Sequence, residues 1–173
     1  MELTWNQLRE QTETCRISVS RPVLLPGDGE ELSLQAEKFN RFSDMLAAHI
    51  AGSAGNASSL RAEGSGWLRN QRYLSVCFYI LRFENGSLSG FSCVSHNRDL
   101  KNGIILRLRD IITKEGMQKA ALFGKKFHGC YFDEKGLHLY ICNFNKEQAK
   151  HCRVSQYPSF LQEYIIENSF FAI

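Results

Sequence analysis

Residues 71–83 read QRYLSVCFYILRF, and this stretch decides the fold. It is long and apolar, and large side chains recur at alternate positions, as they do in a β-strand. These alternating residues include Leu74, Val76, Phe78 and Ile80. Asn85-Gly86 follows shortly after and is the dipeptide most typical of a two-residue hairpin turn. The sequence therefore predicts a strand over 71–83 that turns back into a second strand at 90–99.

The chain beyond this hairpin predicts a third strand and a short helical segment. Lys101-Asn102-Gly103 predicts a turn, which we expect Asp99 to open, and residues 104–108 then form the third strand of a meander. Residues 110–123 are predicted to form one or two helical turns that break near Gly116.

A second hairpin is predicted around Glu134-Lys135-Gly136, with strands at 127–133 and 137–142. Gly136 suits the left-handed backbone position of such a turn. Residues 160–173 are apolar enough to form a last strand.

The N-terminal part predicts a strand, a helix and a loop. Residues 14–20 alternate polar and apolar side chains, and Pro22 and Pro26 are expected to end that strand. Residues 32–50 predict a helix, because apolar residues recur at spacings of three and four. This apolar stripe comprises Phe39, Phe42, Leu46 and His49 or Ile50. Residues 51–66, rich in Gly, Ala and Ser, are predicted to be a flexible loop.

Together these elements predict an α+β fold, in which one main helix packs on an antiparallel sheet of hairpins. We expect the helical stripe to face Val76, Phe78 and either Tyr131 or Leu139. The length of 173 residues fits one domain over 1–173, comprising an N-terminal part (14–66), a sheet region (70–145) and a C-terminal extension (146–173). Hydrophobic residues make up 43% and charged residues 23%, as in globular proteins rather than disordered ones.

The net charge and the N-terminal sequence bear on nucleic-acid binding, membrane insertion and cellular compartment. The net charge is only +3 and the basic residues are scattered, so nucleic-acid binding is not expected. The first residues, MELTWNQ, do not resemble a signal peptide, and the longest apolar runs are far shorter than a membrane span. The sequence as written therefore predicts a cytoplasmic protein. Its six cysteines show no C-x-x-C spacing and are expected to be reduced thiols.

Two stretches resemble a known domain. They are residues 74–112, which include Asn97-Arg98-Asp99-Leu100-Lys101-Asn102-Gly103, and residues 132–140, which read FDEKGLHLY. They resemble the domain that forms the extracytoplasmic sensor of RsiV-type anti-sigma factors, over residues 70–145. That domain also accompanies some peptidoglycan deacetylases and stands alone in other bacterial proteins.

This resemblance implies an α+β fold without catalytic residues. For the anti-sigma members alone it implies a protein ligand, lysozyme. Two features depart from the family. Its usual Gly-Gly-Ala-His at the first hairpin tip is replaced here by Asn85, Gly86, Ser87 and Leu88, and the membrane anchor and sigma-binding segment of anti-sigma factors are absent.

The second hairpin is where the sequence suggests chemistry. If Asp133 pairs with Leu137, then His128, Cys130 and Cys142 share one face of the hairpin, and Tyr131 and Leu139 lie on the other. His and Cys side chains are zinc ligands, and a histidine beside a cysteine can activate a thiolate. However, a zinc site needs a fourth ligand, and no orienting acid or oxyanion loop is evident. We expect no bound metal and no cofactor.

The leading hypothesis is thus a non-enzymatic binding or regulatory domain that contacts a protein or a glycan. The first hairpin tip, Asn85 to Leu88, is its candidate contact, because loops on rigid scaffolds often carry binding residues. A metal- or thiol-dependent site on the 127–142 hairpin is the alternative, and a structural or assembly role is a third hypothesis.

Overall fold

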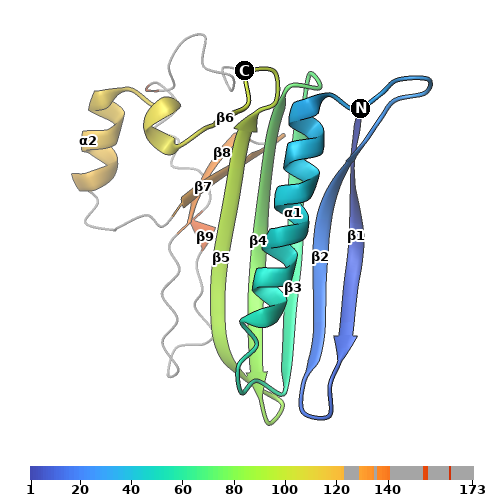
Figure 1. Ribbon diagram of the computed structural model, residues 1–173. Helices are drawn as coiled ribbons and strands as arrows, with labels where there is room; N and C mark the ends of the chain where they lie inside the picture. The colour runs from blue at the N-terminus through green and yellow to red at the C-terminus, as the bar shows by residue number, and fades with distance from the viewer. Residues whose placement is uncertain (123–128, 135, 141–153, 156–163, 165–173) are drawn as a thin grey trace.

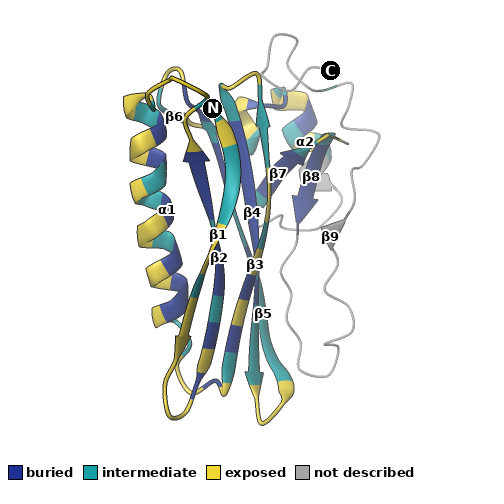
Figure 2. Ribbon diagram, turned by 90° about the vertical axis from the view of Figure 1, so that its right-hand side faces the viewer, coloured by how far each residue is buried: buried dark blue, intermediate teal, exposed yellow. Residues whose placement is uncertain are grey.

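The protein has an α+β fold, in which one long helix and a small second sheet cover opposite faces of a six-stranded mixed sheet (Figures 1 and 2). A computed structural model describes residues 1–122, 129–134, 136–140, 154–155 and 164. The strand order of the large sheet is β1-β2-β3-β4-β5-β6, and that of the small sheet is β7-β8-β9. The predicted α+β fold is confirmed; the pairing of β2 with β3 is parallel, so the sheet of hairpins is mixed at this one junction.

The predicted meander is confirmed as strands β4 (Tyr73–Glu84), β5 (Ser87–Asp99) and β6 (Ile104–Ile105). Asn85 and Gly86 form the β4–β5 turn with φ angles of 50° and 78°, the left-handed values that a tight hairpin turn requires. Strand β6 is shorter than predicted, and the chain turns into the 3₁₀ segment Leu108–Asp110.

Strand β3 (Ser59–Arg69) occupies the second half of the predicted 51–66 loop, so that prediction is wrong from Ser59 onward. Its glycines indicated a loop, but they serve close packing instead. A Cβ atom at Gly64 would overlap the Trp5 ring, and one at Gly66 would lie 2.8 Å from a methyl group of Leu3. The glycines in β3 therefore allow strand β1 (Glu2–Gln11) to pack over it. The sequence did not predict this first strand.

Strand β2 (Arg16–Leu25) runs through Pro22, where the sequence predicted its end. Its parallel pairing with β3 covers only Arg16–Val19, so Pro22 interrupts no ladder on that side. The helix covers this open edge instead. Asn40 accepts a hydrogen bond from Leu24 N (2.8 Å) and donates one to Leu24 O (2.9 Å).

Helix α1 (Leu34–Gly52) confirms the predicted helix within two residues at each end. Ser33 caps its start, because the Ser33 hydroxyl accepts a hydrogen bond from Ala36 N at 3.2 Å. Phe39 is fully buried with Val76 and Phe78, as predicted, whereas Phe42 is only partly buried.

The predicted contacts of this helix with Tyr131 or Leu139 are wrong. Both residues belong to clusters formed with the small sheet, on the opposite face of β4 and β5. The reason is the alternation of β4: its even-numbered side chains face α1, and its odd-numbered ones face the small sheet.

The small sheet consists of β7 (Gly129–Asp133), β8 (Gly136–Tyr140) and β9 (Val154–Ser155). Helix α2 (Lys114–Leu122) precedes it and continues through Gly116, so the predicted break is wrong. A Cβ atom at Gly116 would lie 2.5 Å from that of Tyr164, which explains the glycine by packing. Apart from Tyr164, the strand predicted at 160–173 lies outside the described residues. In the described part of the chain, every helix is too short or too polar to cross a membrane.

Candidate functional site

Three connections meet at one end of the large sheet, which we call the loop end (Figures 1 and 2). They are the β1–β2 turn (residues 12–15), the α1–β3 connection (residues 53–58) and the β4–β5 hairpin tip (residues 85–86). Because they belong to three separate hairpin or crossover units, the loop end gathers residues that are far apart in sequence.

Hydrogen bonds join these connections into one scaffold. Thr12 shapes the first turn: its hydroxyl accepts a hydrogen bond from Cys15 N at 2.9 Å, and its backbone N donates to Cys15 O at 2.9 Å. Arg16 N then donates to Ser58 O at 3.1 Å. Ser58 in turn donates to Phe83 O, from its backbone N at 2.8 Å and from its hydroxyl at 3.0 Å. The first turn is thereby linked, through Ser58, to the strand that leads into the hairpin tip.

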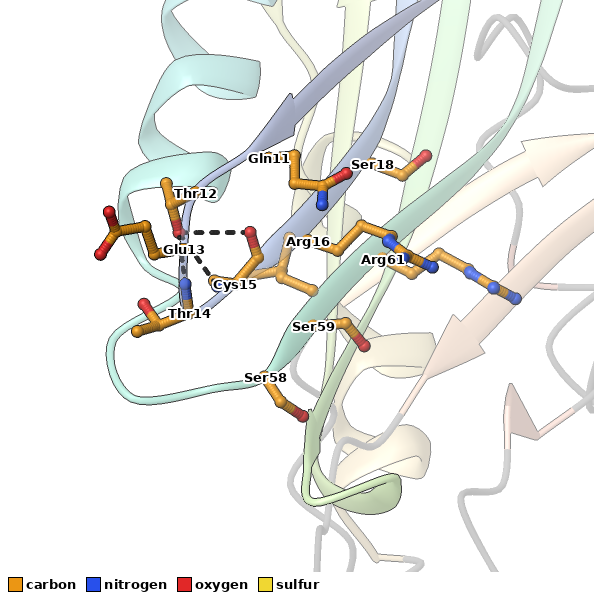
Figure 3. A pocket seen from close by; sticks show the side chains of 11 residues that line it. Gln11, Thr12, Glu13, Thr14, Cys15, Arg16, Ser18, Ser58, Ser59 and Arg61 are labelled. Atoms are coloured by element: carbon orange, nitrogen blue, oxygen red, sulfur yellow. Dashed lines mark hydrogen bonds between the residues drawn. The ribbon is translucent and has the colours of Figure 1, made fainter.

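A cleft of about 330 Å³ lies between the β1–β2 turn and the start of β3 (Figure 3). Its lining is mostly polar, with hydroxyl groups from both sides. The residues that supply these hydroxyl groups are Thr12, Thr14, Ser18, Ser58 and Ser59. Arg16 and Arg61 also line the cleft, both exposed, and their side chains point in the same direction in Figure 3. Such a lining suits a polar ligand that accepts hydrogen bonds.

The sequence alone did not single out Arg16 and Arg61 as site residues. They come together because the parallel pairing sets Arg16 opposite Ser59 and Ser18 opposite Arg61. A signal was present in each strand: residues 16–19 and 59–62 both alternate polar and apolar side chains, which places the arginines on the polar face. The pairing of the two strands, which are separated by a helix, was not predictable from that alternation.

The predicted contact tip is connected to the wall of this cleft through Phe83, which lies opposite Ser59 and accepts hydrogen bonds from Ser58. Asn85, Gly86 and Ser87 are exposed, and Leu88 is half-buried opposite Phe83. The register shifts between Arg82 and Phe83, so a β-bulge precedes the tip and bends it. The role of the tip in binding stays a prediction.

The second hairpin has a register one residue away from the predicted one. Asp133 lies opposite Gly136, Cys130 opposite Leu139 and His138 opposite Tyr131. The predicted register is therefore wrong. The physical reason is burial, since the observed register gathers Cys130, Phe132, Leu137 and Leu139 into one apolar cluster. His128 and Cys142, the other two candidate ligands, lie outside the described residues.

The environment of Cys130 disfavours thiol chemistry. Its side chain is 4% exposed, and burial raises the pKa of its thiol to about 12. A thiol with that pKa stays protonated at neutral pH and is a poor nucleophile. Among the residues that the structure describes, no three His, Cys, Asp or Glu side chains cluster as metal ligands would.

Polar side chains between the two sheets are engaged in packing. The Ser75 hydroxyl donates to Asn97 Oδ1 (2.7 Å) and accepts from Phe132 N (2.7 Å), and Asn97 Nδ2 donates to Cys130 O (2.9 Å). On the other face of β7, the Tyr131 ring stacks on His138 at 4.6 Å, and His138 Nε2 lies 2.7 Å from Asp133 Oδ1. The hydrogen bonds of Ser75 and Asn97 fix the small sheet on β4 and β5, and the contacts of His138 hold β7 and β8 together.

Asp99 opens its turn as predicted, because Asp99 Oδ1 accepts a hydrogen bond from Lys101 N at 2.9 Å. The buried carboxylate also binds Arg72 with two hydrogen bonds, of 3.0 Å and 2.8 Å. The Arg72 guanidinium lowers the pKa of Asp99. This pair locks the end of the sheet opposite the loop end, which is a structural role.

The sequence matches no protein-family model and no curated protein. Its fold is similar to that of solved structures. A DUF3298 family protein from Pseudomonas aeruginosa PAO1 is 12% identical, with a TM-score of 0.51 over 81% of this chain and 83% of that one. A member of the DUF3298 family from Bacteroides fragilis NCTC 9343 is 16% identical, with a TM-score of 0.44 over 87% and 92%. At these identities the first comparison supports a DUF3298-type fold and nothing about the ligand.

Proposed function

We propose that this chain is a non-enzymatic binding or regulatory domain whose ligand is held at the loop end of the sheet. The observation that carries this proposal is the polar cleft of about 330 Å³, formed between hydrogen-bonded connections on a rigid sheet. Clefts of this size accommodate small ligands, and a binding site on a fixed scaffold loses little entropy when it is occupied.

The nature of the cleft favours a glycan over a protein as the ligand. Its lining presents hydroxyl and guanidinium groups, which suit a ligand rich in hydroxyl or anionic groups. A protein partner would need a surface of roughly 800 Å² on each side, with an apolar centre. The tip at Asn85 to Leu88, at the same end of the sheet, would extend the contact.

The surroundings of Cys130 and Asp99 do not favour catalysis. The thiol of Cys130 is buried and protonated, and the carboxylate of Asp99 is held by Arg72. The resemblance to RsiV-type sensor domains also supports a binding or regulatory role without catalysis.

A nuclear magnetic resonance titration tests this proposal. Isotope-labelled protein would be titrated with a panel of neutral and acidic oligosaccharides, including soluble peptidoglycan fragments. We expect saturable shifts in the amides of residues 12–18, 58–61 and 85–88, with residues 129–134 and 136–140 unchanged. Shifts confined to the second hairpin, or no saturable shift with any member of the panel, would overturn the proposal.

A further inference from the structure

Resting on the proposed function, we infer that the loop end binds an anionic ligand, whose phosphate or carboxylate groups lie over Ser18 between Arg9, Arg16 and Arg61. The inference comes from the strand register, which arranges these arginines around one small side chain. It deepens the proposed function by naming the class of ligand.

The register places the three arginines in two rows across β1, β2 and β3. In the first row, Arg9 lies opposite Ser18, and Ser18 lies opposite Arg61. In the second row, Gln11 lies opposite Arg16, and Arg16 lies opposite Ser59. Each row thus alternates arginine with a shorter, uncharged side chain.

All six side chains lie on the solvent face of the sheet. Ile17 and Leu60, which alternate with them, point the other way into the core beneath α1. Arg9, Arg16 and Arg61 are all exposed. In Figure 3 the side chains of Arg16 and Arg61 extend in the same direction from neighbouring strands, and Ser18 lies two residues after Arg16 on β2. An approaching ligand therefore meets the three arginines without any rearrangement of the backbone.

The spacing lets three guanidinium groups reach one ligand. Neighbouring strands are about 4.8 Å apart and residues two apart on a strand about 7 Å, so the bases of the three side chains lie within roughly 10 Å. Each arginine side chain is long enough to lean over Ser18 from its own direction. Guanidinium groups bind phosphate and carboxylate through paired hydrogen bonds, which makes this geometry selective for oxyanions.

This face carries positive charge with little compensation. Glu63 lies 4.0 Å from Arg61, but both side chains are more than 60% exposed, so their attraction is weak. In the described part of the chain, no carboxylate lies within 4.0 Å of Arg9 or Arg16. The carboxylate of Glu13, on the turn, points away from the arginines of the cleft in Figure 3.

Adjacent like charges on a sheet face repel, and this repulsion destabilises the unliganded protein. A bound anion relieves it, so binding should also raise the melting temperature. A ligand with two or three anionic groups would contact more than one arginine at a time. Its affinity should therefore exceed that of a monovalent anion.

The test uses isothermal titration calorimetry and thermal unfolding of the full chain with two probes, tripolyphosphate and citrate, at constant ionic strength. Sodium acetate and sodium chloride are the monovalent controls. We expect saturable binding of at least one probe. An Arg16→Gln, Arg61→Gln double variant should bind it about tenfold or more weakly, since charged hydrogen bonds are lost. Tripolyphosphate and citrate distinguish phosphate from carboxylate, and binding of either supports the inference.

The matched control is Arg41→Gln. Arg41 is 71% exposed on α1, away from the cleft. The affinity of the Arg41→Gln variant for the probe should therefore remain within about twofold of the wild-type affinity. Equal stabilisation by chloride, or unchanged affinity in the double variant, would overturn the inference. If neutral oligosaccharides shift the loop-end amides while neither anion binds, this inference fails and the proposed function stands. If neither class binds there, both fail.

Discussion

Lowering the pH should destabilise this protein through one buried histidine, His96. Its side chain is 8% exposed and stacks on the Phe42 ring at 4.2 Å, beneath helix α1. Burial, together with the smaller effect of the nearby positive charge of Arg98, lowers its pKa from 6.5 to about 4. Among the described residues, its Nε2 atom has no hydrogen-bond partner that would stabilise a proton there.

The direction of this pH effect depends on whether the folded or the unfolded chain binds a proton more readily at His96. Between pH 6.5 and about 4, the unfolded chain binds a proton at this histidine and the folded chain does not, so protonation favours unfolding. The contribution of neutral His96 to the free energy of unfolding is therefore fully present above pH 6.5, and it decreases as the pH falls toward 4. One pKa unit corresponds to about 1.4 kcal/mol, so the loss should be on the order of 3 kcal/mol.

The assay is urea unfolding at a series of pH values, with His96→Leu as the comparison because leucine fills the site without titrating. Between pH 7 and pH 4, the wild-type free energy of unfolding should fall by about 3 kcal/mol more than that of the variant. All other titrating groups are shared, so the difference isolates His96. Parallel curves for the two proteins would refute the argument that this histidine stays neutral in the fold.

Further predictions concern packing, the ion pair and the thiols. Phe39→Ala should cost about 3–5 kcal/mol of unfolding free energy and Phe42→Ala less, because only Phe39 is fully buried; an equal loss in urea unfolding contradicts this. Gly64→Ala should destabilise by about 1–3 kcal/mol through overlap with a tryptophan ring, whereas Gly90→Ala, whose new methyl group meets its nearest atom at 3.4 Å, should be tolerated. Asp99 has a lowered pKa, so its contribution is present above about pH 4 and is lost as the pH falls through that pKa; Asp99→Asn should remove this acid dependence from the unfolding curve. All six cysteines should react as thiols in denaturant without reductant, and a count of two or fewer would contradict the predicted reducing compartment.

The sequence predicted those elements whose signal is local. The β4–β5 hairpin followed from alternation and from Asn85-Gly86, and helix α1 followed from its apolar stripe. The turn at Asp99 followed from a residue type that hydrogen-bonds its own backbone. In each case, residues close in sequence contain the information.

Where partners are distant, local patterns misled. Gly64 and Gly66 indicated a loop because the reason for them, the Trp5 ring on another strand, is not visible locally. The predicted register of the second hairpin was off by one residue. Both faces of β7 and β8 are buried, so alternation alone did not identify the core face. His128 and Cys142, which the sequence grouped with Cys130, lie outside the described residues, so that grouping stays a prediction.

The same distant packing produces the candidate site. Because β3 lacks side chains at Gly64 and Gly66, the first residues of β1, including Trp5, pack over it. The Trp5 ring lies edge-on to the Phe78 ring, with 6.0 Å between the ring centroids. The β1–β2 ribbon is thereby anchored at the end far from its turn, and the parallel pairing of β2 with β3 fixes it at the other. Those two anchors set Arg9 and Arg16 beside Arg61. A substitution at Gly64 should consequently weaken anion binding at the loop end as well as stability, although it touches no arginine. Unchanged affinity in a folded Gly64→Ala variant would show that the parallel pairing alone positions the arginines.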